Sequence, residues 1–439
     1  MDRDTAEPTV DSFPGPRARD RASRHAAVAA PSTHVYEFVW DPTADAIGPY
    51  CTDVDGNVLL DFTSHVAAAP LGYNNPHLLA RLDEFDLVDP LKFAGQDFYA
   101  DLGDLPGPTE LMERLTDIAP DGHDTVFLSN TGAEAVENAI KICYDARPGA
   151  EYGITFEGSF HGRTLGALSL NRSKAVHRRG FPEIAGVSSV PFCEDQTCDP
   201  STCSCGFFPD ESGTSWLRRR LGPDGSIDPE SVAYVILEPV QGEGGYRIPS
   251  EAFMAEVAAV CGEYGIPLIA DEIQTGMGRT GEWWGADNYA IEPDVLAVAK
   301  GLRVGATVGR EELFPDQTGR LSSTWGGGDL LSSMVGALTI DAIQAENLRQ
   351  NARKRGDELA ELLDTSPIVD AIDVRNLGSL VAVEFETKAR RDEMVTACAK
   401  AGLLTLPCGL KTIRLLPPLD VREREIAQAV ARFEDAAEV

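Results

Sequence analysis

The chain has 439 residues, enough for two domains around a large core, and its hydrophobic fraction of 43% is ordinary for a globular enzyme. Its net charge is −32, from 70 acidic and 38 basic residues, so nucleic acid or an anionic membrane would be repelled as a partner. The sequence has no run of about 18 apolar residues, and no membrane span is expected.

The acidic surplus and the N-terminus bear on where the protein works. Dense surface carboxylates favour solubility, and molar salt screens their repulsion to about 3 Å, so we favour a halophilic source. Residues 1–33 are charged, contain prolines and lack the apolar stretch of a signal peptide. We therefore expect a disordered, solvated tail that is neither a signal peptide nor a helix, and a cytoplasmic protein.

The sequence next predicts a segment over 34–85 that contributes to a small domain and to the active site, followed by a large α/β domain over 86–328. Within the first segment, Asp55-Gly56 is a favoured turn, so residues 50–62 predict a hairpin. In the second, continuous apolar runs indicate strands buried on both faces, as in a mostly parallel sheet flanked by helices. The predicted strands are 125–130, 152–158, 232–240, 266–271 and 294–301, with helices over 133–146 and 251–264.

Residues 329–439 predict a smaller α+β domain that begins after a run of glycines at 326–328. Its first half reads as one long helix, and its second half mixes helices with strands whose apolar residues alternate. The predicted elements are a helix over 330–363, a strand over 378–386, a helix over 388–401, a strand over 412–416 and a terminal helix from Val421.

A glycine pattern at 276–281 imitates a dinucleotide-binding motif. Gly276, Gly278 and Gly281 satisfy G-x-G-x-x-G and follow a predicted buried strand. That motif must also open a long helix, whereas the residues that follow here are EWWGADNYAIEPD. Dinucleotide binding is therefore the weaker interpretation.

An acid and an amine end two neighbouring predicted strands. Asp271 closes IPLIAD and Lys300 closes DVLAVAKG, and the carboxyl ends of parallel strands meet at the ligand crevice. A lysine there suits Schiff-base chemistry, and a carboxylate against a pyridine nitrogen would strengthen the ring as an electron sink. The pattern alone explains an ordinary Lys–Asp ion pair about as well.

Two upstream segments add features that a phosphorylated aromatic cofactor would need. Backbone amides at the helix start formed by Thr131, Gly132 and Ala133 could hold a phosphate, although a plain helix cap is the commoner meaning of such a turn. Phe160 follows the strand at 152–158, where its face could stack on a planar ring. Arg163 could bind a substrate carboxylate through both arms of its guanidinium.

Six stretches, in order, resemble the class III (omega-type) aminotransferases of fold type I: SNTGAEAVENAIK, SFHGRT, ILEPVQGEGG, ADEIQTGMGRTG, PDVLAVAKG and STWGG. The resemblance covers roughly residues 34–439 and implies pyridoxal 5′-phosphate as cofactor. It implies that Lys300 forms the Schiff base and moves the proton, that Asp271 faces the pyridine nitrogen, and that Phe160 lies against the ring. It places Gln274 at the ring hydroxyl and Thr324 of the other subunit at the phosphate, which implies a homodimer with shared active sites.

The same resemblance implies how substrates are bound. Glu243 and Arg414 would form a switch, paired while an ω-amine donor is bound and parted when 2-oxoglutarate needs the arginine. Arg163 takes a substrate carboxylate, and Gln274 and Ser323 also contact substrate. Within the class, LLDFTSHVAAAPLGYNNP, LSSTWGG and TLPCGLKTIRLLPPLDV most resemble the lysine 6-aminotransferases.

The expected activity is a ping-pong transfer of an amino group from a lysine-like donor to 2-oxoglutarate. N-acetylornithine, ornithine and 4-aminobutyrate remain alternative donors. An amino-acid racemase or aminomutase remains an alternative reaction, because class III contains both and they use the same lysine and acid. A catalytically inactive binding or metal-sensing protein is a further rival, which the intact Lys300 and Asp271 argue against.

Four of the nine cysteines are crowded between residues 193 and 205, in FCEDQTCDPSTCSCGFF. Clustered thiols in a cytosolic protein indicate metal before disulfides, although the spacing of Cys193, Cys198, Cys203 and Cys205 is not a standard zinc pattern. The alternatives are a structural zinc ion and a loop that carries free thiols.

Overall fold

The structure is a computed structural model, and it describes residues 1–34, 36–84, 95–97, 103–184, 186–210, 212–322, 324 and 326–438. The chain divides into two compact units, unit 1 (Met1–Ala80 and Gln350–Val439) and unit 2 (Arg81–Arg349). Among the described residues, no helix is both long and apolar enough to cross a membrane.

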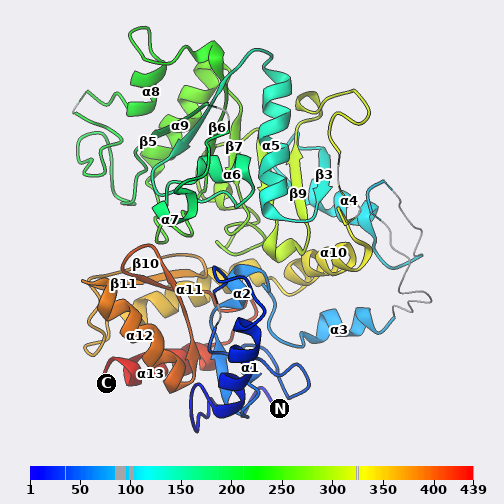
Figure 1. The fold of residues 1–439 in the computed structure, drawn as a ribbon, viewed down its shortest axis with the longest axis vertical. Helices are drawn as coiled ribbons and strands as arrows, with labels where there is room; N and C mark the ends of the chain where they lie inside the picture. The colour runs from blue at the N-terminus through cyan, green and yellow to red at the C-terminus, as the bar shows by residue number, and fades with distance from the viewer. Residues whose placement is uncertain are drawn as a thin grey trace. The chain divides into compact units, whose positions relative to one another are not determined.

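Unit 2 is built on a seven-stranded sheet in the order β3-β9-β8-β7-β6-β4-β5 (Figure 1). The strands from β8 to β5 are all parallel, and β9 runs antiparallel to both β8 and β3. The strand bounds are β3 Thr125–Ser129, β4 Tyr152–Phe156, β5 Gly186–Val190, β6 Val232–Leu237, β7 Leu268–Asp271, β8 Val295–Val298 and β9 Gly305–Gly309.

Helices cover both faces of this sheet. Alternate residues of β6 point to opposite sides: Ile236 packs with the apolar face of α5, and Leu237 packs with α9. Every residue of β6, β7 and β8 is buried, which explains why these strands are continuous apolar runs in the sequence. The helix bounds in unit 2 are α4 Pro108–Ile118, α5 Gly132–Ala146, α6 Leu165–Leu170, α7 Ala175–Arg178, α8 Trp216–Leu221, α9 Glu251–Tyr264 and α10 Leu330–Ala345.

Unit 1 contains a four-stranded antiparallel sheet in the order β10-β11-β14-β13 and a three-stranded sheet in the order β1-β2-β12. The larger core cluster of this unit gathers apolar residues of both sheets and of α11, α12 and α13. The bounds are α1 Pro16–Ala26, β1 Tyr50–Thr52, β2 Val58–Asp61, α2 Ser64–Ala67, α3 Pro76–Leu82, α11 Leu348–Asp364, β10 Asp373–Leu377, β11 Leu380–Glu384, α12 Lys388–Ala401, β12 Leu403–Leu404, β13 Leu406–Cys408, β14 Thr412–Leu415 and α13 Glu423–Ala437.

The predicted α/β class, the mostly parallel sheet and the hairpin at 50–62 are confirmed, and each predicted strand of the large domain is present within a few residues. The single helix predicted over 330–363 is wrong. It is two helices, α10 and α11, which separate at Asn347, where φ is 52°. An asparagine tolerates this left-handed conformation, which no continuing helix allows. Unit 2 ends at Arg349 and so includes α10, which was assigned to the small domain.

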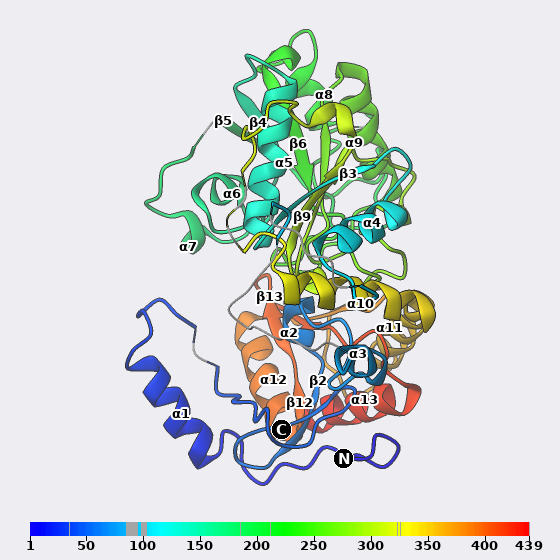
Figure 2. The same cartoon turned by 90° about the vertical axis from the view of Figure 1, so that its right-hand side faces the viewer.

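The prediction of a disordered tail over 1–33 is also wrong. Residues 16–26 form α1, and the Asp55 carboxylate of the hairpin turn accepts the amides of Arg17 and Ala18 at its N-terminus, both at 2.8 Å. Arg3 pairs with Asp420 and with Glu425 of α13, at 2.8 and 2.7 Å. The first residues of the chain, at the N label in Figure 2, lie beside α13, where Arg424 and Gln428 donate to the carbonyl of Ala6 at 2.8 and 3.2 Å. These contacts join residues more than 400 positions apart.

Helix α2 is unusual because its residues are left-handed. Ser64, His65, Val66 and Ala67 have φ values of 42°, 49°, 61° and 68°. A non-glycine residue adopts this conformation at a cost of about 1–2 kcal/mol. The Ser64 hydroxyl donates to the carbonyl of Leu416 at 2.6 Å, which ties the turn to the end of β14.

Candidate active site

Asp271 and Lys300 start from the same edge of the seven-stranded sheet. Asp271 is the last residue of β7 and Lys300 follows the adjacent parallel strand β8 by two residues. Asp271 is buried and Lys300 is half-buried. Lys300 has a φ of 47°, and strained backbone of this kind concentrates at functional sites. The predicted acid and amine are therefore brought to one edge.

His161 holds the Asp271 carboxylate and was missed in the sequence. His161 Nδ1 lies 2.8 Å from Asp271 Oδ2, and its side chain is fully buried. Because an ionised carboxylate only accepts hydrogen bonds, Nδ1–H is the donor. The other oxygen of Asp271 accepts the Ile273 amide at 3.1 Å. The available signal was a histidine between Phe160 and Arg163, two residues already assigned to the site.

The start of α5 offers two backbone amides. Thr131 is the N-cap residue: its hydroxyl accepts the Glu134 amide at 3.2 Å, and the Glu134 carboxylate accepts the Thr131 amide at 3.1 Å. The first hydrogen bond within the helix is donated by Ala135, so neither helix nor cap uses the amides of Gly132 and Ala133. With the positive end of the helix dipole, these amides form an anion site.

Two glycines let the start of α5 approach the end of β7 and the start of β9. A Cβ added to Gly132 would lie 2.8 Å from the Ile273 side chain, next to the Asp271 strand end. A Cβ added to Gly305 would lie 2.4 Å from the carbonyl oxygen of Thr131. No larger residue fits either position without movement of its neighbours, so the anion site adjoins the acid and the segment after the lysine.

Phe160 is held in place by a buried glutamate. Its amide donates to Glu238 Oε1 and the Gly242 amide donates to Oε2, both at 2.9 Å. Burial raises the pKa of Glu238 to about 7, and the charge of Asp271 adds to the rise, while the two amide donors oppose it. Arg163 is exposed, and its guanidinium carbon lies 5.8 Å from the centre of the Phe160 ring.

Two residues of unit 2 have side-chain partners: Gln274, predicted at the cofactor ring, and Glu243, predicted in the substrate switch. The Tyr246 hydroxyl donates to Gln274 Oε1 at 2.8 Å, and Gln274 is buried. Glu243 Oε2 lies 3.3 Å from Lys174 Nζ, an ion pair that the sequence did not predict. Lys174 is therefore a further cation beside the predicted switch glutamate.

The remaining predicted residues lie on other elements. Arg414 is in the middle of β14 in unit 1, opposite Ala382 of β11, and it is 5% exposed. Thr324 Oγ1 accepts from Asn130 Nδ2 of the same chain, which places it beside the N-cap of α5. Ser323 lies outside the described residues.

The G-x-G-x-x-G stretch forms turns, which agrees with the prediction that it does not open a long helix. Positive φ angles at Gly278 and Gly281 bend the chain, and no long helix follows. Glu272 closes this turn region by accepting the amides of Gly285 and Ala286 at 2.7 and 2.8 Å. Burial raises the pKa of Glu272 to about 7.

The class III aminotransferase family matches residues 37–437 of this sequence. The chain belongs to the class III aminotransferases. It is 32% identical to the acetylornithine aminotransferase of Archaeoglobus fulgidus, over 87% of this chain and 92% of that protein. It is 30% identical to the alanine/serine racemase of Pyrococcus horikoshii, over 94% and 89% of the two chains. Its structure is similar to that of the lysine aminotransferase of M. tuberculosis, with a TM-score of 0.81, 28% identity and coverage of 94% and 98%.

Class III aminotransferases depend on pyridoxal phosphate, and the residues present fit this cofactor. Gly132 and Ala133 offer the amides that a phosphate needs, and the close packing at Gly132 keeps side chains out of the turn. Asp271 and Lys300 supply the carboxylate and the amine at the adjoining strand ends. When bound, pyridoxal phosphate acts as an electron sink for the carbon that loses its proton.

Proposed function

We propose that this class III aminotransferase moves the terminal amino group of a lysine-like donor to 2-oxoglutarate by a ping-pong reaction. The observation that carries the proposal is the strained Lys300 at the same sheet edge as the Asp271–His161 pair, beside the anion site at the start of α5. The choice of donor rests on the likeness to the M. tuberculosis lysine aminotransferase.

Each residue has a proposed task at the cofactor. Lys300 holds the cofactor and moves the proton, and Asp271, fixed by His161, serves the pyridine nitrogen. Gln274 serves the ring hydroxyl and Phe160 the ring face. The amides of Gly132 and Ala133, with the Thr131 side chain beside them, bind the phosphate.

Substrate carboxylates call for cations, and two arginines are proposed to bind them. Arg163 is exposed beside Phe160 and is proposed to bind the carboxylate of the donor, with Gln274 and Ser323 as further contacts. Arg414 is proposed to bind 2-oxoglutarate, and Glu243 to neutralise it while the donor is bound. The Lys174–Glu243 pair supports the second half of this switch, because it gives Glu243 another cation when Arg414 is occupied.

We also propose a homodimer whose sites are completed by the neighbouring subunit, with Thr324 at its partner's phosphate. In the single chain, Thr324 already lies next to Asn130 at the N-cap of α5. The net charge of −32 supports the accompanying proposal that the enzyme works in the salt-rich cytoplasm of a halophile.

The alternatives differ in substrate or in reaction. The A. fulgidus relative favours N-acetylornithine as donor, and ornithine and 4-aminobutyrate are the other alternative donors. The P. horikoshii relative favours a racemase or aminomutase, for which the same lysine and acid would suffice. Two bound carboxylate substrates, as the arginine set implies, favour transamination.

Two assays on the purified enzyme with added pyridoxal phosphate separate these possibilities. In the first, glutamate formed from 2-oxoglutarate is measured with lysine, ornithine, N-acetylornithine and 4-aminobutyrate, and lysine is expected to give the highest kcat/KM. In the second, each amino acid is incubated without an acceptor and its optical rotation is followed. Loss of rotation without glutamate formation would replace the proposal with a racemase, and a faster rate with N-acetylornithine would replace the donor.

A further inference from the structure

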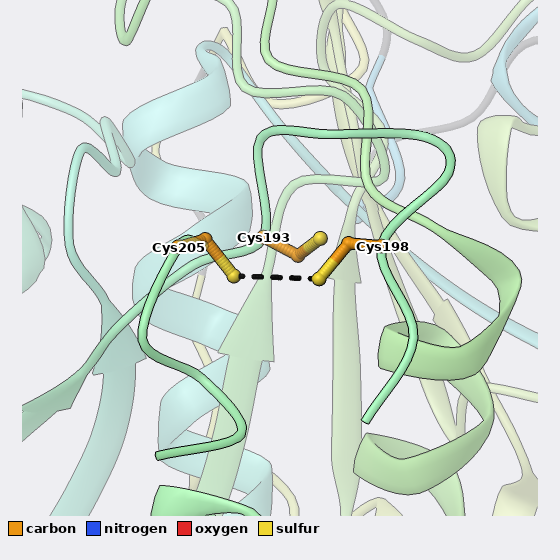
Figure 3. Close-up of side chains that lie close together, drawn as sticks. All are labelled: Cys193, Cys198 and Cys205. Carbon is orange, nitrogen blue, oxygen red and sulfur yellow. Dashed lines mark hydrogen bonds between the residues drawn. The ribbon is translucent and has the colours of Figure 1, made fainter. Parts of the chain in front are cut away.

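Three thiols converge in the segment between β5 and α8, over residues 191–215. The Sγ atoms of Cys193, Cys198 and Cys205 all lie within 4.8 Å of one another, and Figure 3 shows the three side chains pointing toward a common point. Cys198 and Cys205 are 3.9 Å apart. A fourth thiol, Cys203, lies 3.3 Å from Cys205. None of these cysteines forms a disulfide.

The other five cysteines show what ordinary buried thiols look like in this chain. Cysteine behaves as a small apolar residue, so burial alone says little about function. These five lie singly in regular elements: Cys51, Cys143, Cys261, Cys398 and Cys408. Three of the remaining four converge on one point, and the fourth, Cys203, lies against Cys205. The described residues of this segment form neither helix nor strand, so the arrangement is different.

The hydrophobic core places these thiols. Phe192, next to Cys193, and Phe207, two residues after Cys205, both pack on Phe253 of α9, with ring centres 4.9 and 4.4 Å apart. The segment is longer than the roughly 15 residues that loops without secondary structure usually reach, so it needs a further constraint. The aromatic anchors bring the two ends of the cysteine run together, and the thiols then face one another.

The geometry points to a structural zinc ion bound by Cys193, Cys198, Cys203 and Cys205. Tetrahedral zinc with Zn–S bonds of about 2.3 Å separates its sulfur ligands by about 3.8 Å, close to the 3.9 Å between Cys198 and Cys205. A disulfide would need about 2.05 Å and would join only two of the four sulfurs. Thiolates are soft ligands that select zinc over magnesium or calcium.

The surroundings of the sulfur cluster fit a closed structural site. The Phe208 amide donates to Cys203 Sγ at 3.3 Å, the kind of outer hydrogen bond that orients a metal ligand. Four thiolates leave no open coordination position, so the ion takes no part in the amino-group transfer. Zinc replaces the thiol protons when it binds, and it ties the segment together. Glu194, beside Cys193, pairs with Arg247 at 2.9 Å, so the segment is also joined to the chain that follows the QGEGG turn.

Metal analysis of the full-length protein tests this inference. The protein is purified without added metal and without chelator, and its zinc and iron are measured by inductively coupled plasma mass spectrometry and by native mass spectrometry. One zinc per chain is expected, with loss of the zinc in Cys198→Ser and in Cys205→Ser. Cys261→Ser is the matched control, because it removes a buried thiol that packs on the same core and should retain the metal.

A second measurement on the unaltered protein covers the case in which a serine variant does not fold. Zinc is removed with a mercurial reagent and a chelator, and Co²⁺ is added in its place. A thiolate-to-cobalt charge-transfer band with four sulfur ligands supports the site. The inference is overturned if the protein holds neither zinc nor cobalt, if the metal is iron, if Cys198→Ser keeps its full zinc, or if the intact mass shows disulfides among these cysteines.

Discussion

The two sheets of this enzyme carry the side chains that we propose as functional in different ways. In the seven-stranded sheet, the acid and the amine come at or after the ends of β7 and β8, outside the apolar interior of the strands. In the four-stranded sheet, Arg414 sits in the middle of β14, where every residue is buried. A charge at a strand end can be solvated by ligand or water, whereas a charge within a buried strand must be neutralised by the protein or its substrate. The first arrangement suits the chemistry that we propose for Asp271 and Lys300, and the second suits the switch that we propose for Arg414.

The largest expected effect comes from removing the amine of Lys300, which follows β8 of the seven-stranded sheet. Lys300→Ala should lower turnover by at least ~10²–10⁴-fold in both half-reactions, since the proposed mechanism assigns the proton transfer to this amine alone. Its melting temperature should stay close to that of the parent. Lys141→Ala on the exposed side of α5 is the control and should keep full activity. Turnover by Lys300→Ala, measured as glutamate formed, would contradict the proposed role.

The second effect tests the strand-end acid. Asp271→Asn removes the charge that His161 Nδ1 contacts, so both half-reactions should slow by roughly 10²-fold or more. Cofactor affinity, measured by fluorescence titration, should fall as well. Asp294→Asn is the matched control, because Asp294 accepts the Leu268 amide at the opposite end of β7. If Asp271→Asn and Asp294→Asn lose activity equally, the effect is structural.

The third effect should be confined to one half-reaction. Arg414→Ala should slow the 2-oxoglutarate half far more than the donor half, because the proposed switch assigns this guanidinium to 2-oxoglutarate alone. Truncating one partner of a buried charge pair costs about 2–5 kcal/mol. Single-turnover rates of the two halves, followed separately by absorbance, measure the difference. Arg375→Ala on β10 of the same sheet serves as the control, and equal losses in both halves of Arg414→Ala would refute the switch.

A smaller effect concerns buried carboxylates near the strand ends. The pKa of Glu238 is about 7 in the folded chain, above its value of about 4.3 when unfolded, so the folded state binds more protons between these pH values. Stability therefore falls as pH rises from about 4.5 to 7, by on the order of 3 kcal/mol for this group. Urea unfolding at pH 5 and pH 8 should show a smaller fall in Glu238→Gln than in the parent. The exposed Glu312→Gln should behave like the parent, and a variant with an undiminished fall would disprove the assignment.

The smallest expected effect is a rise in stability with salt concentration, and it should apply to both units. From about 0.1 M to about 1 M KCl the screening length falls from about 10 Å to about 3 Å, which relieves repulsion among the 70 acidic residues. The free energy of unfolding should rise by on the order of 1 kcal/mol. Thermal unfolding across this range measures it, with sucrose as a control that does not screen charge. A flat or falling melting temperature would argue against a halophilic source.

The sequence predicted the parts of the fold whose burial is continuous. Strands such as β6 and β8 are buried on both faces, so their apolar runs were visible without a structure. The N-terminal segment was mispredicted because its order comes from Asp55 and from the Arg3 ion pairs, which local patterns do not contain. Its one local signal was Pro16, which is favoured at the first position of a helix.

The residues of the candidate site also divide into those that the sequence predicted and those that it missed. Asp271, Lys300 and the α5 turn were predictable because strand ends and a helix start mark them in the sequence. His161 and Lys174 were missed because each gains its meaning from a partner far along the chain, at Asp271 and at Glu243. Such pairings arise only when the strands are placed side by side.

The left-handed turn α2 has a consequence for how the chain folds. Its four residues together hold about 4–8 kcal/mol of unfavourable backbone energy, comparable to the whole stability of many domains. This energy opposes the turn in an isolated peptide, so we expect it to form once the end of β14, which accepts the Ser64 hydroxyl, is in place. Substitutions there should change the unfolding rate and leave the folding rate nearly unaltered. Val66→Gly should relax the turn, because glycine adopts a positive φ without the steric cost that valine carries.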